Sequence, residues 1–460
     1  MEQKTSSVES TKLAIKFAIP TFLEGMLAQM ENSYFIFFMS SICLMSTAAV
    51  AKVTGIGSTL IAISSLFSGI IMQSITFKKG KYRPWLIIAA IGILIGRAMQ
   101  FTKINASENV LVTWFIVGYL LMNFAYAFTC TAEQSLMTSA APDGGTRVKM
   151  SSWRTVGSNV MKLIFGAVAL PFIQSFASEV AGYSVMGIIT GVLAAIGGFF
   201  LFFTTKPSDD VQVVAGDKSK DNTKVNIIEM LKYTVINKDA ILFYLAMWFK
   251  VASSLLIAFS ISFYFQYYVG NMAMMTIYLT SSSFVKIVGS FVTPYIAKLF
   301  KGVRNTYGGA LIGYCVLFVV CFLLKGNPAV VAVILSINEF FWGVYQSAEL
   351  PLYMGVIDET EYKSGKDLTA FMMSVWTFGI KVGIIIANFC LTQGMLTIGF
   401  EAAAVTEEAV SKLPIICLLG PALLAALAAV FTFLIPLTDD KIAEYRAANA
   451  AKKAEMAQGN

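Results

Sequence analysis

The chain has 460 residues, of which 57% are hydrophobic and 13% are charged. Soluble domains are about 25% charged and about 45–50% apolar, so this composition excludes a soluble enzyme as the default interpretation. The sequence contains no histidine, which excludes histidine-based metal sites and Ser/His or Cys/His catalytic groups. We therefore expect a membrane protein that is not an enzyme and that carries no metal and no cofactor.

Twelve apolar segments are long enough to cross a bilayer, which takes roughly 20 residues in a helix. The first segment follows a polar stretch without the short apolar region and cleavage site of a signal peptide, so we expect it to be retained. The predicted spans cover residues 13–44, 50–77, 85–102, 111–138, 154–177, 182–205, 239–269, 273–297, 305–324, 328–357, 367–397 and 413–436.

A long polar stretch divides these spans into two sets of six. We expect an N-terminal six-helix bundle at 1–205, a central cytoplasmic loop at 206–238, a C-terminal six-helix bundle at 239–436 and a cytoplasmic tail at 437–460. This layout fits two parallel repeats around a site at the membrane midplane, as in secondary transporters. A nucleotide-driven pump is not expected, because the chain has no GxxxxGK[ST] sequence.

The distribution of positive charge predicts the orientation. Most of the 34 lysines and arginines lie in the N-terminal segment, in the tail or in loops after even-numbered spans, whereas the opposite loops hold only Lys52, Lys103, Lys325 and Lys412. The positive-inside rule then places both termini in the cytoplasm of a cell-membrane protein. The net charge of +7 mostly reflects this bias, so we expect the lipid bilayer and no nucleic acid as a partner, and a monomer.

Ionisable residues inside the predicted spans are costly to bury and are candidate functional groups. Glu24 and Glu31 are seven residues apart and share one face of the first span. They are interpreted either as a substrate-binding or proton-carrying stripe or as partners of structural salt bridges. The equal numbers of acids and bases suggest internal pairing among Arg97, Lys162, Lys250, Lys286, Lys381, Glu24, Glu31, Glu133, Glu339 and Glu349.

Aromatic rings and amides are dense in two spans, as FYFQYY at 263–268 and NEFFWGVYQ at 338–346. Sugar faces stack on aromatic rings and amides bind hydroxyls, although ordinary helix packing accounts for any single ring as well. Trp342 and Trp376 are the better candidates, because each lies beside other polar groups in its span.

Four stretches of the chain match motifs of one transporter family. They are KGKYRPWLI at 79–87, TRVKMSSWRTVGS at 146–158, NKDAILFYLAMWF at 237–249 with YYVGN at 267–271, and IDETEYKSGKDLTAFMMSVWTFGIKVG at 357–383. The chain resembles the glycoside–pentoside–hexuronide cation symporters, the melibiose-permease-like branch of the major facilitator superfamily, over nearly its whole length. The resemblance implies an all-α integral membrane protein with a major-facilitator-type fold, twelve transmembrane helices in two six-helix bundles. It also implies alternating access, a sugar-like solute and, usually, symport with Na⁺, Li⁺ or H⁺.

The resemblance also assigns roles to individual residues. Arg154 matches the family's arginine of span 5, Lys381 its lysine of span 11, and Trp342 lies in the span 10 segment that contributes a tryptophan near the sugar. The candidate substrate-binding residues are Glu24, Glu31, Asn123, Tyr126, Arg154, Trp342, Gln346, Trp376 and Lys381. The candidate gating residues are Lys81, Arg83, Asp358 and Lys363. The position of Arg154 near a loop favours a part in the cytoplasmic gate over contact with the solute.

Several positions depart from the family's pattern. Ile61 and Ser65 replace the two carboxylates that Na⁺-coupled members carry on span 2. Gly25 replaces the sugar-binding aspartate of span 1, with Glu24 adjacent, and Asn123 replaces that of span 4. A hard cation needs several oxygen ligands, so H⁺ is the expected coupling ion and Na⁺ is less expected.

These departures leave several interpretations open. The chain transports a glycoside or related small organic solute, either coupled to a proton through Glu24, Glu31 or Glu339, or uncoupled. A carrier of an amphipathic non-sugar solute, lipid-like or steroid-like, would also fit the loss of the sugar-binding aspartates. A non-transporting sensor on a carrier fold is the third interpretation. Lys381 would lack its acidic partner in span 2, although Glu31 or Glu339 could substitute.

Overall fold

The structure is a computed structural model that describes residues 7–75, 77, 80, 82–140, 144–205, 237–365 and 368–458. Within these residues, twelve helices are long and apolar enough to cross a membrane, which confirms the predicted number of spans. The amphipathic helix suggested by NIIEMLKYTV in the central loop lies outside the described residues.

Helices of the first half begin and end close to the predicted spans, except that α5 begins ten residues earlier than expected. They are α1 (Ser7–Met30), the π-helices η1 (Glu31–Phe35) and η2 (Phe38–Ile42), α2 (Thr47–Ser74), α3 (Arg83–Gln100), α4 (Glu108–Ala140), α5 (Gly144–Gln174) and α6 (Glu179–Thr204).

The second half has a similar set of helices and one that the sequence analysis did not predict, α16. They are α9 (Lys238–Phe263), the π-helix η3 (Tyr264–Tyr268), α10 (Ala273–Leu299), α11 (Val303–Leu323), α12 (Pro328–Ser364), α13 (Thr369–Thr397), α14 (Glu407–Pro414), the π-helix η4 (Ile415–Leu419), α15 (Gly420–Phe433) and α16 (Asp439–Gln458).

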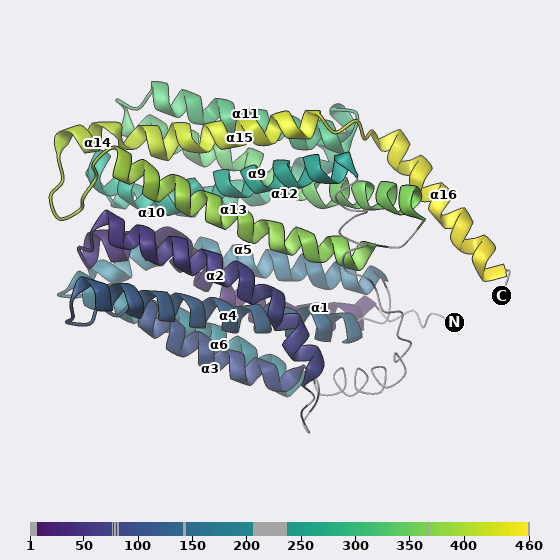
Figure 1. Cartoon of the computed structure of the whole chain (residues 1–460), viewed down its shortest axis with the longest axis horizontal. Coiled ribbons are helices and arrows are strands. Elements are labelled where there is room, and N and C mark those ends of the chain that lie inside the picture. The colour runs from purple at the N-terminus through teal and green to yellow at the C-terminus, as the bar shows by residue number, and fades with distance from the viewer. Residues whose placement is uncertain are drawn as a thin grey trace. The chain divides into compact units, whose positions relative to one another are not determined.

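The first of two compact units contains Met1–Asn222 together with Phe259–Ser283 and Thr392–Val410. Within it, α1 packs on α5 and α6, α3 packs on α4 and α6, and α2 packs on α4 (Figure 1). Gly25 allows α1 to approach α5 closely, because a Cβ there would meet the Ser158 carbonyl oxygen and the Met161 Cβ at 2.8 Å. A larger side chain at this position would not fit without a shift of α1 or α5.

Two segments from the second half of the chain complete this first unit. The rings of Phe37 and Phe263 lie 5.3 Å apart, and the Ser262 hydroxyl donates to the Ser33 carbonyl. The backbone N–H of Thr47, in the first turn of α2, donates to the Glu401 carboxylate at 2.9 Å. The contact-based unit therefore differs from the simple division into 1–205 and 239–436, which stays a prediction.

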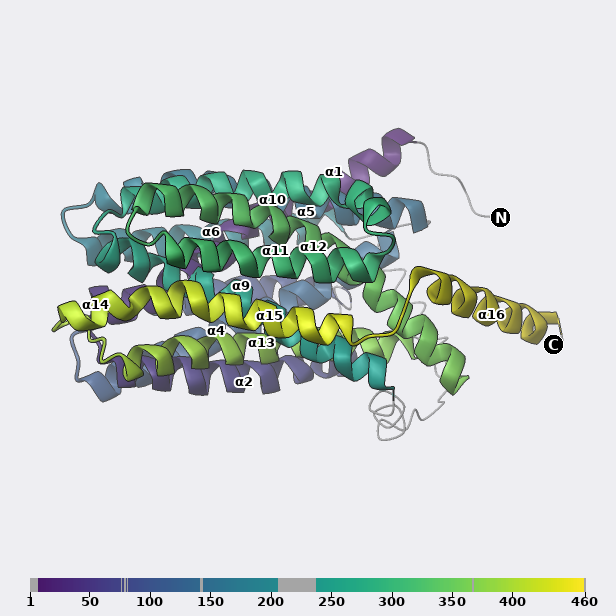
Figure 2. The ribbon, with the colours of Figure 1, turned by 90° about the horizontal axis from the view of Figure 1, so that it is seen from above.

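The second unit contains Thr223–Ala258, Phe284–Leu391 and Ser411–Asn460. Within it, α11 packs on α12 and α15, and α16 packs on the end of α12 (Figure 2). Arg446 of α16 pairs with Asp358 at 3.0 Å, and the Asn449 amide donates to the Asp358 carbonyl at 2.8 Å. The alanine-rich composition of α16 favours a helix, which the expectation of a plain tail overlooked.

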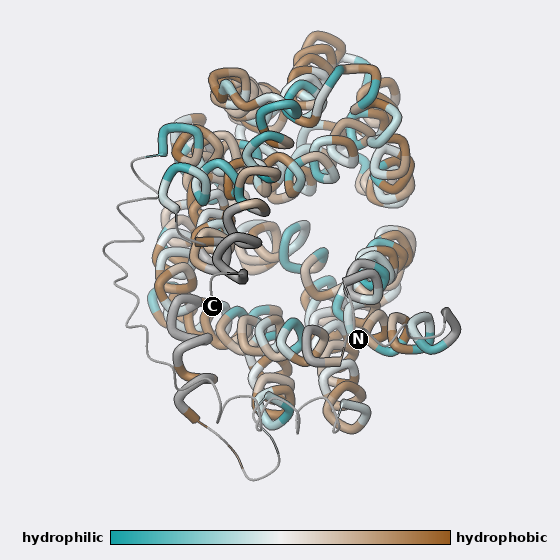
Figure 3. Tube along the Cα trace, turned by 90° about the vertical axis from the view of Figure 1, so that its right-hand side faces the viewer, coloured by the Kyte–Doolittle hydropathy of each residue, from teal (hydrophilic) through white to brown (hydrophobic). Residues whose placement is uncertain are grey.

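Many large apolar side chains are exposed and several charged side chains are buried, unlike in a typical soluble protein. Phe203, Phe291 and Leu323 are 72%, 69% and 74% exposed, whereas the Arg97 side chain is fully buried. Figure 3 shows apolar residues on the helices of both units. This distribution suits a lipid environment, in which buried ionisable groups need partners within the protein.

Four π-helical turns interrupt the described spans, two of them in the first span. In η2 the Cys43 N–H donates to the Phe38 carbonyl at 2.8 Å, and after η3 the Val269 N–H donates to the Tyr264 carbonyl at 3.0 Å. Each such turn holds one residue more than an α-helical turn and rotates the side chains that follow. The sequence analysis places Glu24 and Glu31 on one face by assuming α-helical geometry. That geometry extends only to Met30, because η1 begins at Glu31.

Candidate functional site

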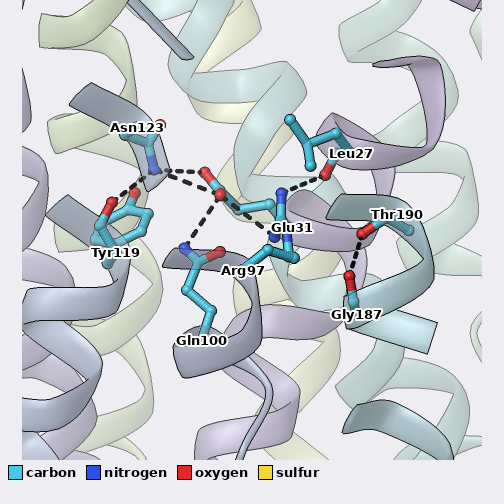
Figure 4. A network of polar contacts seen from close by, with 8 residues as sticks. All are labelled: Leu27, Glu31, Arg97, Gln100, Tyr119, Asn123, Gly187 and Thr190. Atoms are coloured by element: carbon cyan, nitrogen blue, oxygen red, sulfur yellow. Dashed lines mark hydrogen bonds and ion pairs between the residues drawn. The ribbon is translucent and has the colours of Figure 1, made fainter. Parts of the chain in front are cut away.

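Glu31 is the centre of a polar network that joins three helices of the first unit (Figure 4). Its carboxylate lies 3.6 Å from Arg97 Nη1 and accepts hydrogen bonds from Gln100 Nε2 at 3.3 Å and Asn123 Nδ2 at 3.2 Å. Arg97 also donates to the Leu27 carbonyl at 2.9 Å. The charge of Glu31 is therefore matched by one guanidinium and two amides, as a buried ion pair requires.

Glu24 belongs to a different cluster, which contains a second carboxyl group. Arg154 Nη2 lies 2.6 Å from Glu133 Oε2, and Arg154 Nε donates to the Thr21 hydroxyl at 3.0 Å. The Glu24 and Glu133 carboxyl groups lie close enough to interact with each other. Glu24 is 4% exposed and Glu133 is 1% exposed, and the Oε1 atom of each has no partner among the described atoms. The Tyr126 hydroxyl, hydrogen-bonded to a cysteine thiol, lies close enough to interact with both.

Lys286 and Glu339 form one of the ion pairs inside the membrane-spanning helices of the second unit. Their Nζ and Oε2 atoms lie 3.3 Å apart. The Lys286 ammonium also lies 4.9 Å from the centre of the Trp342 ring, within the range of a cation–π interaction. Trp342, predicted as a sugar contact, thus lies next to the Lys286 ammonium, which Glu339 holds in place.

Lys250 and Glu349 form the second pair, with Gln346 as a third member. Lys250 Nζ lies 2.8 Å from Glu349 Oε2 and donates to the Gln346 carbonyl oxygen at 3.3 Å. The Gln346 amide donates in turn to Glu349 at 3.4 Å. The predicted solute contact Gln346 is therefore partly occupied by bonds within the protein.

Lys381 makes no ion pair or hydrogen bond with any residue that the structure describes. Glu31 and Glu339, which were considered as acidic partners of Lys381, do not pair with it. Glu31 pairs with Arg97, and Glu339 pairs with Lys286. Trp376 lies on the same helix, with its ring 5.4 Å from that of Tyr353 and its Nε1 without a partner in the described part of the chain.

The predicted gating residues contact their own units. Arg83 donates from Nε to the Phe202 carbonyl at 2.8 Å and lies 4.5 Å over the Phe202 ring. Asp358 pairs with Arg446, and Lys363 pairs at 2.8 Å with Glu359, one helical turn away. Lys81 lies outside the described residues. The gating role of these four residues stays a prediction.

The internal pairing suggested by the sequence is confirmed for three glutamates, Glu31, Glu339 and Glu349, whereas Glu133 pairs with Arg154, which was not in the predicted set. Gln100 is a fully buried member of the Glu31 network that the sequence analysis missed. The signal was present, since Gln100 is an amide three residues after Arg97 in a mostly apolar helix. Ile61 is buried, and the Ser65 side chain lies outside the described part of the structure, so their assignment to the family's two carboxylate positions stays a prediction.

Comparisons with known proteins agree with this architecture. The family described as "MFS/sugar transport protein" matches residues 16–439. An uncharacterized symporter of Bacillus subtilis, YjmB, is 24% identical over 96% of this chain and 97% of its own length. The lactose permease of Lactobacillus delbrueckii subsp. bulgaricus is 25% identical over 79% of this chain and 60% of its own. The solved structure of the nucleoside transporter NupG shares the fold, with a TM-score of 0.62 and 14% identity over 93% of this chain and 100% of that one.

The family match runs from the first span to the end of the last, and the relatives confirm the resemblance to the glycoside–pentoside–hexuronide symporters. Twelve apolar helices and the fold of solved transporters agree with it. The chain belongs to the MFS/sugar transport protein family and is a multi-pass membrane protein, a secondary transporter of the major facilitator superfamily and not an enzyme.

Proposed function

We propose that the protein carries a glycoside or related small solute across the cell membrane by alternating access, as a monomer with both termini in the cytoplasm. The observation that carries this proposal is the set of amides, carboxylates and a tryptophan inside the membrane-spanning helices. Sugar hydroxyls need convergent donors and acceptors, and sugar faces need aromatic rings. Asn123 on α4 supplies such a group in the first unit, and Gln346 and Trp342 on α12 supply them in the second unit.

We infer that the coupling ion is a proton rather than Na⁺. Na⁺ would need several oxygen ligands, and Ile61 gives a buried apolar side chain at a position where Na⁺-coupled relatives carry a carboxylate. Of the three glutamates considered for a proton, Glu31 and Glu339 each have a cationic partner of their own. Glu24 instead faces a second carboxyl group and is the best candidate.

Uptake into proteoliposomes tests both parts of the proposal. A panel of labelled glycosides is measured under a proton gradient, under a Na⁺ gradient and with neither. We expect at least one glycoside to accumulate only under the proton gradient. Equilibration without any gradient would indicate an uncoupled facilitator, and accumulation driven by Na⁺ would contradict the proton. Uptake restricted to lipid-like or steroid-like compounds would favour the amphipathic alternative, and binding without any uptake would favour a sensor.

Lys381 favours a solute that carries an acidic group. An ammonium inside a membrane-spanning helix needs an anionic partner, and the described part of the chain offers Lys381 none. A carboxylate on the solute would provide that partner when it binds. The panel should therefore contain matched pairs of neutral glycosides and their uronic-acid forms, and we expect the acidic member of a pair to bind more tightly.

A further inference from the structure

Three helices of the first unit bring two carboxyl groups and one guanidinium together. Glu24 comes from α1, Glu133 from α4 and Arg154 from α5. Arg154 lies 2.6 Å from Glu133 and is held in place by its bond to the Thr21 hydroxyl. Both carboxyl groups are more than nine-tenths buried, and each leaves its Oε1 atom without a partner in the described part of the chain.

The charges in this cluster balance only if one carboxyl group is neutral. With both ionised, one negative charge would remain in a buried, apolar environment, where an uncompensated ion costs several kcal/mol. The proximity of the two carboxyl groups leads to the same conclusion. A carboxylate only accepts hydrogen bonds, so two of them in contact need a proton between them.

The cation that acts on both Glu24 and Glu133 is Arg154. Besides each other, the titratable or charged groups that interact with Glu24 and Glu133 are Arg154, Tyr126 and Cys130. Tyr126 and Cys130 are neutral when they carry their ordinary protons and bond to one another. Glu24 is therefore the acid whose O–H donates, and Glu133 the carboxylate that Arg154 neutralises.

Glu31 provides an internal comparison on the same span. Its carboxylate receives a guanidinium and two amide donors, so it needs no proton. Two glutamates seven residues apart thus have opposite requirements.

We propose that Glu24 and Glu133 form a shared-proton pair, and that this pair is the site at which the coupling proton binds. On binding, the proton forms an O–H bond to the Glu24 carboxylate and the new hydroxyl donates to Glu133. On release, that O–H bond breaks and the proton leaves to water, with Arg154 alone facing both carboxylates. The inference rests on the proposed proton coupling for its function, but the pair itself can be tested without transport.

Infrared spectroscopy of the purified full-length protein tests the pair directly. A protonated carboxyl group shows a C=O stretch distinct from that of a carboxylate, and we expect the wild type to show it at neutral pH. Glu24→Gln keeps an N–H donor towards Glu133, so the variant should fold, and it should lose this band. Glu31→Gln, the matched control on the same span, should keep the band.

Uptake then tests the coupling. The ratio of uptake with a proton gradient to uptake without one should fall about tenfold in Glu24→Gln, in the range of typical coupling between two sites. Glu31→Gln should keep the wild-type ratio, whatever its absolute rate. If Glu24→Gln keeps both the band and the ratio, the pair is refuted. If Glu24→Gln loses the band but the wild type shows no proton-driven uptake, the shared proton is supported and the proposed coupling fails.

Discussion

The two units hold their buried charges in different ways. In the second unit, Lys250 and Lys286 each meet one glutamate, at 2.8 Å and 3.3 Å. In the first unit, Arg154 is placed between two carboxyl groups, only one of which it can neutralise. The second unit also has the opposite imbalance, in Lys381, which meets no carboxylate among the described residues.

This comparison separates structural charges from functional ones. A one-to-one buried pair is complete by itself, and its main effect is to fix the geometry of its helices. A carboxyl group in excess needs a proton, and an ammonium in excess needs an anion. A proton and an anionic solute can both bind and dissociate. Glu24 and Lys381 are therefore the positions at which we expect the proton and the solute to bind.

Removing the arginine of the unbalanced cluster should have the largest effect. Arg154→Ala leaves Glu133 and Glu24 buried without a cation, and we expect a loss of about 3–5 kcal/mol in unfolding free energy, because one partner of a buried pair is removed. Denaturation of the detergent-solubilised protein measures it. The double variant Arg154→Ala, Glu133→Gln should recover much of that loss. Equal instability of the two variants would contradict the charge argument.

Removing the unpaired lysine should affect the solute more than the fold. For Lys381→Ala we expect the affinity for an acidic glycoside to fall about 10- to 100-fold, the value of one charged hydrogen bond of about 1.5–3 kcal/mol. The midpoint of thermal unfolding should stay unchanged, because Lys381 has no hydrogen bond or ion pair with the described residues to lose. Lys381→Arg should retain part of the affinity, and Lys52→Ala is the control. An equal loss for neutral and acidic forms of the same glycoside would exclude an ion pair with the solute.

The carboxylate at the start of α2 should have a smaller effect. Glu401 accepts two bonds from the Thr47 N–H, at 2.9 Å and 3.2 Å, at the positive end of the helix. Glu401→Gln removes the charge from this contact, and we expect thermal denaturation to show a loss of about 0.5–2 kcal/mol, as for a helix cap. Glu407→Gln, an exposed carboxyl group in the first turn of α14, is the control. If both variants are equally stable, the contact contributes nothing.

Restoring one carboxylate on α2 should have no effect on coupling. Ser65→Asp supplies a single ligand, while Ile61 one turn earlier still offers an apolar side chain. We expect uptake in this variant to remain independent of Na⁺, and uptake in a Na⁺ gradient measures it. Stimulation by Na⁺ would show that other oxygen ligands are already in place, and the double variant with Ile61→Asp shows whether two carboxylates suffice.

The number and class of the helices could be predicted because bilayer thickness imposes them on the sequence. The pairing of charges could be predicted only in part. The need of a buried glutamate for a cation follows from general physical principles. The pairing of Glu31 with Arg97 in particular depends on how α1 and α3 pack, which the sequence does not show. Gly25 shows the same limit, since its close approach to Ser158 and Met161 of α5 becomes visible only in the structure. Residues 437–460 have strong helix formers, a local signal that could have predicted α16.

The π turns of the first span determine how a mutational scan of this protein should be interpreted. An α-helix advances about 100° per residue, so each extra residue in a turn shifts the pattern of tolerant and intolerant positions. A tolerance pattern fitted to residues 13–30 should therefore lose phase at Glu31 and again at Phe38. Relatives aligned to this chain without gaps share side-chain directions beyond Glu31 only if they contain the same two turns.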